Sequence, residues 1–314
     1  MRTTIFLTRL MTAIVLFSMI AISCNKETSQ SGDLSPQEEQ EVAMVSSESE
    51  SEAEIVFDDV FNNVIGVNDE VGVAGIGVFG RATTNGDING DMFTGRTDSI
   101  RCYTVTVTRL NAPNLFPVKI IVDFGNGCVG RDGHIRYGKI VTVYTGRLIN
   151  PGSLATTEFD NFKIDSISVE GRHTIKNTTG NTTGSNLTQF TVDVDDAKLT
   201  KPNGNYSKWD SHKVRTQIEG NGSVGPQDDV FKVTGSANGT VKRNNLLFAW
   251  RSEISEPLIK KFFCRWVSKG IIKTWRATLS NTSPWTAILN FGNGNCDNQA
   301  TLTINGTTHQ ITLH

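Results

Sequence analysis

Residues 118–128 read VKIIVDFGNGC, a β-branched run that leads into a glycine-rich turn and a cysteine. Valine and isoleucine favour strands, and Asn-Gly suits the positive φ values of tight hairpin turns. Comparable runs recur along the chain at 104–108, 140–144, 190–194, 230–233, 246–250 and 311–313. Many short strands separated by such turns predict an all-β fold, a large antiparallel meander arranged as a sandwich or an open barrel.

A repeat divides this β-rich region. The tetrapeptide Phe-Gly-Asn-Gly at 124–127 recurs at 291–294, an offset of 291 − 124 = 167 residues. Each copy follows an apolar run, is followed by a cysteine, and has another cysteine upstream of it. The same elements in the same order predict two related β modules, near 98–148 and 260–314.

The N-terminus has the three parts of a secretory leader. Arg2 and Arg9 supply positive charge, 10–22 is an apolar run, and Ala21-Ile22-Ser23-Cys24 ends it. This ending resembles a bacterial lipobox, in which the cysteine receives acyl chains such as palmitate and becomes the first mature residue. We therefore expect a signal peptide over 1–23 and lipidation of Cys24, which attaches the chain to a membrane. An uncleaved single-pass anchor is the weaker alternative, because a span needs roughly 20 apolar residues.

The segment after Cys24 is rich in Ser, Glu and Gln, with SSESESE at 46–52. Such a composition buries too little apolar area to offset the entropy of ordering it. It predicts a lipidated, acidic, flexible stalk over 24–50 and a β-rich body over 51–314. At the start of this body, apolar residues spaced three and four apart at 53–64 predict a short amphipathic helix that packs on the strands.

The repeat also predicts the disulfides. Four cysteines remain after Cys24, and four cysteines allow three connectivities. Duplicated modules should carry equivalent internal bonds, which favours Cys102–Cys128 and Cys264–Cys296 in an oxidising compartment. Four free, buried thiols are the alternative. Metal binding by thiolates is disfavoured, because the chain has no Cys-x-x-Cys pair and no histidine beside a cysteine.

Taken together, the lipobox, the acidic segment, the paired Phe-Gly-Asn-Gly/Cys elements and Tyr-Gly-Lys-Ile at 137–140 resemble uncharacterised lipoproteins of Bacteroidota. Asn25-Lys26-Glu27 loosely resembles the surface-export signals of that phylum. The resemblance implies an outer-membrane location, on the cell surface or the periplasmic face, and implies no activity. The tripeptides around Ser99 and Ser166 resemble the Asp-Ser/Thr-apolar acceptor of O-glycosylation in the same phylum.

The sequence offers little chemistry for a site. No local catalytic signature is present, no cofactor is implied, and none of the five histidines has a partner at a metal-ligand spacing. A net charge of −2 argues against nucleic-acid binding. Asp87, Asn89, Asp91 and Asp98 weakly resemble a calcium loop. Because Met92 replaces the glycine of its sharp turn, an exposed polar turn is the better interpretation.

Three functions remain open. The leading one is a non-enzymatic interaction or structural module on a membrane anchor, with an unknown protein or glycan partner. A glycan- or lipid-binding lipoprotein is the alternative, because tryptophans can stack on ligands, although core packing is the commoner role for each of the five. They are Trp209, Trp250, Trp266, Trp275 and Trp285. A hydrolase whose site converges only in three dimensions is the least favoured.

Overall fold

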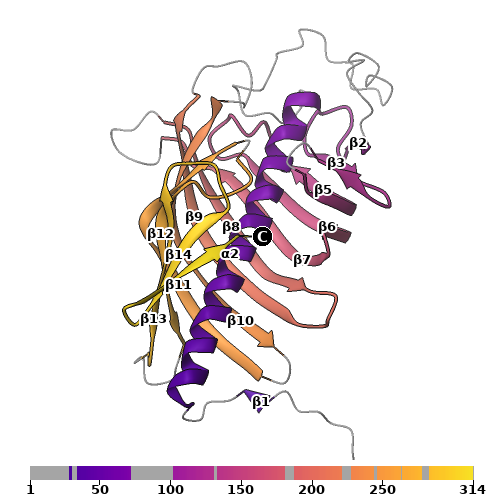
Figure 1. Ribbon diagram of the computed structural model, residues 1–314. Helices are drawn as coiled ribbons and strands as arrows, with labels where there is room; N and C mark the ends of the chain where they lie inside the picture. Colours follow the sequence, from indigo (N-terminus) through magenta and orange to yellow (C-terminus); the bar gives the residue numbers. More distant parts are fainter. Residues whose placement is uncertain are drawn as a thin grey trace, which may run out of the picture.

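The computed structural model describes residues 28–29, 34–71, 102–130, 133–180, 187–220, 228–243, 246–262, 264–277 and 283–313. For 28–29, 67–71 and 246 only the backbone is described. The described chain forms one long helix and a wide antiparallel sheet (Figure 1). The predicted all-β meander is confirmed, as a single open sheet.

Helix α2 (Pro36–Val71) begins at a well-formed cap. The Ser35 hydroxyl accepts the N–H of Glu38 at 3.4 Å, and the Glu38 carboxylate accepts the N–H of Ser35 at 2.8 Å. This reciprocal pair is a capping box, and Pro36 occupies the first helical position, where its missing N–H costs nothing. The sequence Ser-Pro-Gln-Glu at 35–38 therefore sets the start of the helix.

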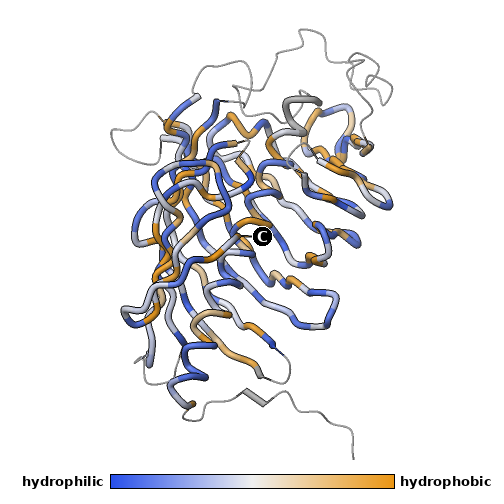
Figure 2. The backbone as a smooth tube through the Cα atoms, viewed as in Figure 1, coloured by the Kyte–Doolittle hydropathy of each residue, from blue (hydrophilic) through white to orange (hydrophobic). Residues whose placement is uncertain are grey.

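The sheet is a meander in which each strand pairs with its neighbours in the chain. Its order is β15-β14-β13-β12-β11-β10-β9-β8-β7-β6-β5-β3-β2, with β4 paired to β5 and β1 paired in parallel to β11. The strands are β1 (Thr28–Ser29), β2 (Thr104–Arg109), β3 (Val118–Asp123), β4 (Cys128–Val129), β5 (Ile135–Tyr144), β6 (Leu154–Ile164), β7 (Ile167–Asn177), β8 (Gln189–Thr200), β9 (Tyr206–Glu219), β10 (Val230–Arg243), β11 (Leu246–Lys261), β12 (Lys269–Arg276), β13 (Thr286–Asn293), β14 (Gln299–Ile304) and β15 (Thr307–Thr312). Figure 2 shows hydrophobic and hydrophilic residues alternating along these strands, as expected where one face of a sheet is buried.

The sheet curves around α2, which crosses its concave face (Figure 1). Near one end of the sheet, the Tyr144 hydroxyl of β5 donates to the Val64 carbonyl at 2.9 Å. At the other end, Gln40 Nε2 lies 3.3 Å from His309 Nε2 of β15. Bulges help to bend the strands: the pairing shifts around Gly138 and Gly235, whose φ angles of 69° and 136° favour glycine.

The core lies between α2 and the concave face of the sheet. The five apolar residues that predicted a helix are all buried against the strands, which confirms that part of the prediction: Ala53, Phe57, Val60, Phe61 and Val64. Trp209, Trp250 and Trp285 are also buried, whereas Trp266 and Trp275 are partly exposed. Core packing is therefore the role of at least three of the five tryptophans.

Two predictions about the N-terminal region are wrong. The helix is long rather than short, and the segment 36–50, predicted as part of a flexible stalk, forms its first half. Ser46, Ser47, Ser49 and Glu50 are buried against the sheet. Serine is small enough to pack there, and the Ser47 hydroxyl donates a hydrogen bond to the Ala43 carbonyl at 2.9 Å. Composition therefore misled, because the strands that bury these residues, and the partners of Glu50, lie far away in the sequence.

The two repeat modules occupy opposite ends of the same sheet. The first contributes β2, β3, β4 and β5, and the second contributes β12 to β15. The disulfides join Cys102 to Cys128 and Cys264 to Cys296, as predicted. In each module the first cysteine precedes a β-hairpin and the second follows it. The hairpins are β2–β3 and β12–β13, so the two disulfides occupy equivalent positions.

Candidate functional site

A ladder of buried ion pairs fixes α2 in the sheet. Four acidic side chains of the helix face four basic side chains of the strands, and each of the eight is at most 8% exposed. The nitrogen–oxygen distances are 2.6 Å for Lys213–Glu54, 2.5 Å for Arg215–Asp58, 2.7 Å for Lys260–Asp58 and 3.0 Å for Arg136 Nε–Asp59. Glu50 accepts the indole N–H of Trp209 at 2.7 Å and lies 3.6 Å from Lys213.

The partners in this ladder favour the charged forms of Asp58 and Lys213, whereas burial, together with the neighbouring Glu54, raises the pKa of Glu50. Burial opposes ionisation of Asp58, but Lys260 and Arg215 outweigh it and lower the pKa of Asp58. Burial likewise opposes the charge on Lys213, but Glu54 and Glu50 outweigh it and raise the pKa of Lys213. Buried ion pairs seldom add net stability compared with apolar packing, but breaking one leaves an uncompensated charge. The ladder therefore favours the register that pairs these charges over registers that would leave them buried and unpaired.

His173 of β7 is the one histidine of the described residues that lies wholly within this interior, at 0% exposure. Its ring stacks on Phe57 of α2, with centroids 6.1 Å apart and planes 21° apart. Burial, aided by the positive charge of Arg215, lowers the pKa of His173 to about 3. The ring is therefore neutral at physiological pH and serves as a packing group.

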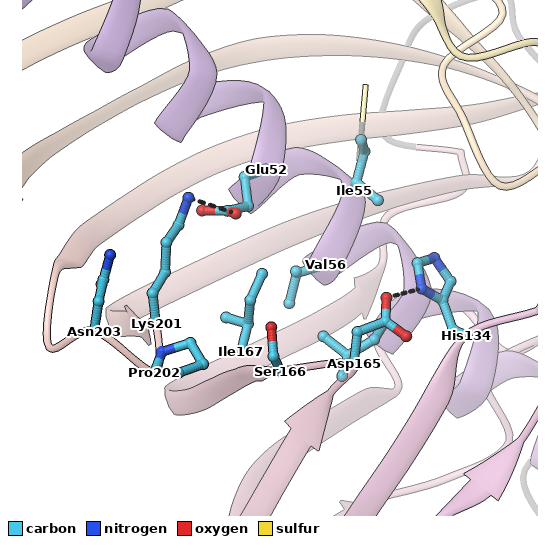
Figure 3. A pocket seen from close by; sticks show the side chains of 11 residues that line it. Glu52, Ile55, Val56, His134, Asp165, Ser166, Ile167, Lys201, Pro202 and Asn203 are labelled. Carbon is cyan, nitrogen blue, oxygen red and sulfur yellow. Dashed lines mark hydrogen bonds and ion pairs between the residues drawn. The ribbon is translucent and has the colours of Figure 1, made fainter. Parts of the chain in front are cut away.

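A hollow with a volume of about 410 Å³ opens beside α2 (Figure 3). We call it the apolar hollow. Its floor is formed by Ile55 and Val56 of the helix and by Ile164 and Ile167 at the turn between β6 and β7. The turn between β8 and β9, at 201–203, forms one wall. Its volume lies within the range of small-molecule sites, which are concave and mostly apolar.

Charged pairs border the apolar hollow on two sides. On one side Lys201 Nζ lies 3.0 Å from the Glu52 carboxylate, and both are drawn in Figure 3. On the other side Asp165 accepts from His134 Nδ1 at 2.7 Å and from the Ile135 N–H at 2.9 Å. Partial burial opposes ionisation of Asp165, but these two partners and Arg265, 3.6 Å away, lower its pKa below the ordinary value.

Ser166, His134 and Asp165 meet in this hollow, but not as a catalytic triad. In a triad the histidine lies between the serine and the carboxylate, so that it can take the serine proton. Here the Asp165 carboxylate lies between Ser166 and His134 (Figure 3). This order does not activate the serine, so the hydrolase hypothesis gains no support from these three residues.

A second, smaller hollow of about 180 Å³ adjoins the first, and we call it the basic hollow. The two share Glu52, Lys201 and Asn203 in their linings. The basic hollow is also lined by Lys242 and Arg243 at the end of β10. Further lining comes from Glu48, which lies 3.9 Å from Arg243, and from Tyr206, over whose ring Lys242 lies at 5.6 Å. Three cations and two carboxylates therefore surround it.

The other predicted site residues divide into two groups. Ser166, a proposed glycan acceptor, is exposed at the β6–β7 turn, which is the position that such a modification requires. Cys24, Ser99 and the weak calcium candidates Asp87, Asn89, Asp91 and Asp98 lie outside the described residues. Within the described part of the chain, no group of three or more His, Cys, Asp or Glu side chains could hold a metal ion, and no helix is long and apolar enough to cross a membrane.

The sequence reasoning missed the ladder and both hollows. Ser207, Trp209, Ser211, Lys213 and Arg215 alternate along β9 and face inward, although most are polar. No prediction was made for these polar residues. One signal was available: acidic residues at 50, 54 and 58 recur every four positions, so they share one helix face. Comparison with known protein families, curated proteins and solved structures finds no match to this chain.

Proposed function

We propose that this chain is an exported lipoprotein, anchored to the outer membrane through acyl chains on Cys24, whose β-rich body is a non-enzymatic binding module. The observation that carries the binding role is the apolar hollow. It lies beside a helix that buried ion pairs hold in one register, so its walls are preorganised. A preorganised site favours binding, because less conformational entropy of the protein is lost when the ligand binds.

The apolar floor favours a lipid-like ligand over a glycan. Sugars stack on exposed aromatic faces, but three tryptophans are buried and none of the described tryptophans lines either hollow. Isoleucine and valine side chains instead offer contact to an aliphatic chain. We therefore propose a lipid, rather than a glycan, as the ligand of the apolar hollow.

The anchor can be tested by feeding cells an alkyne analogue of palmitate and comparing the wild-type chain with Cys24→Ser. We expect label on the wild type and none on the variant, because acyl transfer requires that thiol. Equal labelling of both chains would overturn the anchor. Protease treatment of intact cells then tells the two membrane faces apart: loss of the chain indicates the cell surface, and protection indicates the periplasmic face.

A further inference from the structure

The two hollows together form a surface with an apolar part and a basic part. The apolar hollow has four branched aliphatic residues in its floor, and the basic hollow has three cations in its lining. They meet at Glu52, Lys201 and Asn203, which line both. An amphiphile with an anionic head group has the same division, with its charged group at one end and its chain at the other.

The cations of the basic hollow remain accessible to a ligand. The side chains of Lys201 and Arg243 are 47% and 48% exposed, and Glu48, the partner of Arg243, is 53% exposed. Exposed ion pairs contribute little to stability, so an incoming phosphate can replace the carboxylate at small cost. In Figure 3 the side chains of Lys201 and Asn203 rise from the same turn, and Lys201 reaches toward Glu52.

The N-terminal strand brings the membrane anchor to this same end of the molecule. Thr28 and Ser29 of β1 pair with Leu246 and Leu247 at the start of β11, a few residues along the chain from Arg243 (Figure 1). Three residues lie between Cys24 and Thr28, and the four steps from one Cα to the other reach at most about 14 Å when extended. If acyl chains on Cys24 enter a bilayer, the start of β11 must therefore lie close to its head groups.

We propose that the end of the molecule formed by residues 201–203, the end of β10 and the start of β11 rests on the membrane and binds an anionic phospholipid there. The phosphate occupies the basic hollow, and part of one acyl chain occupies the apolar hollow. This inference rests on the proposed function, because the anchor sets which end faces the bilayer. The proposed ligand is a phospholipid of the membrane that holds the anchor, rather than a free amphiphile.

The test uses the mature chain from residue 24 with Cys24→Ser, so that binding is measured without the anchor. Vesicles of 30% phosphatidylglycerol in phosphatidylcholine are compared with vesicles of phosphatidylcholine alone by co-sedimentation. We expect binding to the anionic vesicles and a loss of about fivefold in the partition coefficient for Arg243→Ala, since each basic residue near an anionic surface contributes about that factor. Lys232→Ala is the matched control, because Lys232 is exposed at the opposite end of the same strand.

A second measurement examines the acyl chain. Monomeric dodecyl phosphate, inorganic phosphate and dodecyl maltoside are titrated into the same chain by calorimetry. We expect dodecyl phosphate to bind at least tenfold more tightly than either of the others. Ser166→Trp, which fills the apolar hollow from an exposed turn, should remove its preference over inorganic phosphate. Circular dichroism of each variant shows whether it has kept its fold.

Each contrary result has a distinct meaning. Equal sedimentation with both kinds of vesicle, or equal losses for Arg243→Ala and Lys232→Ala, overturns the membrane contact. Tight binding of dodecyl phosphate without a preference for anionic vesicles also overturns it, and indicates a free amphiphile as the ligand. Palmitate labelling of Cys24 is independent of these results, so the anchor and the phospholipid site can fail separately.

Discussion

At the scale of single residues, the unusual feature is the number of charges buried between α2 and the sheet. Asp58 of the helix lies 2.5 Å from Arg215 and 2.7 Å from Lys260, with all three side chains almost fully buried. A charge in such a place depends on its partners, because water cannot solvate it. The consequence of losing one partner is therefore predictable.

Replacing Asp58 with alanine leaves Arg215 and Lys260 buried without their shared carboxylate. We expect the free energy of unfolding to fall by about 3–5 kcal/mol, measured by urea denaturation. Glu48→Ala is the matched control, since Glu48 lies on the same helix and faces Arg243 at 3.9 Å in an exposed position. It should change stability by less than about 1 kcal/mol. Similar effects of both substitutions would contradict the ladder.

His173 predicts how stability depends on pH. Its pKa is about 3 when folded, against an ordinary value of 6.5 when unfolded. Between these values the unfolded chain binds the extra proton, so stability falls as the pH is lowered. At pH 4.5 the contribution of this residue is a loss of about 3 kcal/mol relative to neutral pH.

His173→Phe should remove this contribution while keeping a ring against Phe57. The comparison is the difference in unfolding free energy between pH 7.5 and pH 4.5, measured for the wild type and the variant by chemical denaturation. We expect a smaller difference for the variant, because other titrating groups are shared by both chains. An unchanged difference would mean that the buried ring is not the cause.

At the scale of elements, α2 takes the place that a second sheet or a set of helices would otherwise fill. Its first half carries serines and glutamates, yet Val42, Ala43 and Val45 are buried there beside the polar residues. The concave face therefore needs the whole of 36–66 to be covered. This distinguishes a core element from a stalk.

Truncation separates these two roles. A chain that starts at residue 34 keeps α2 and should unfold cooperatively, as the full mature chain does. A chain that starts at residue 51 loses Glu50, which partners Trp209, together with the buried apolar residues of the first helical turns. We expect it to lose the cooperative thermal transition, followed by near-ultraviolet circular dichroism. A transition shared by both truncated chains would restore the stalk interpretation.

At the scale of the whole molecule, one sheet joins both repeat modules, and α2 contacts strands near both of its ends. We therefore expect a single unfolding transition. Replacing Cys264 and Cys296 together with serine should lower the stability of that entire transition by about 3–4 kcal/mol, the chain-entropy value for a loop of this length. Two separate transitions, with only one affected, would show that the modules unfold independently.

Much of this architecture could be predicted from residues 118–128 and from the similar β-branched runs elsewhere in the chain. Strand positions and hairpin turns are local properties, since β-branched alternation and Asn-Gly act over a few residues. The disulfides followed from the repeat, because the two modules carry their cysteines in the same order. The start of α2 is likewise a local property, because Ser35 and Glu38 form a capping box.

The burial of α2 and the two hollows depended on contacts between distant parts of the chain. Glu50 and Glu54 meet partners 159 residues away, and Asp58 meets Arg215 at a separation of 157. Whether a serine- and glutamate-rich segment is solvated or buried is decided by the charges that face it, and those charges lie on strands that curve around it. Composition describes a segment alone, whereas its free energy of burial belongs to the pair of surfaces that come together.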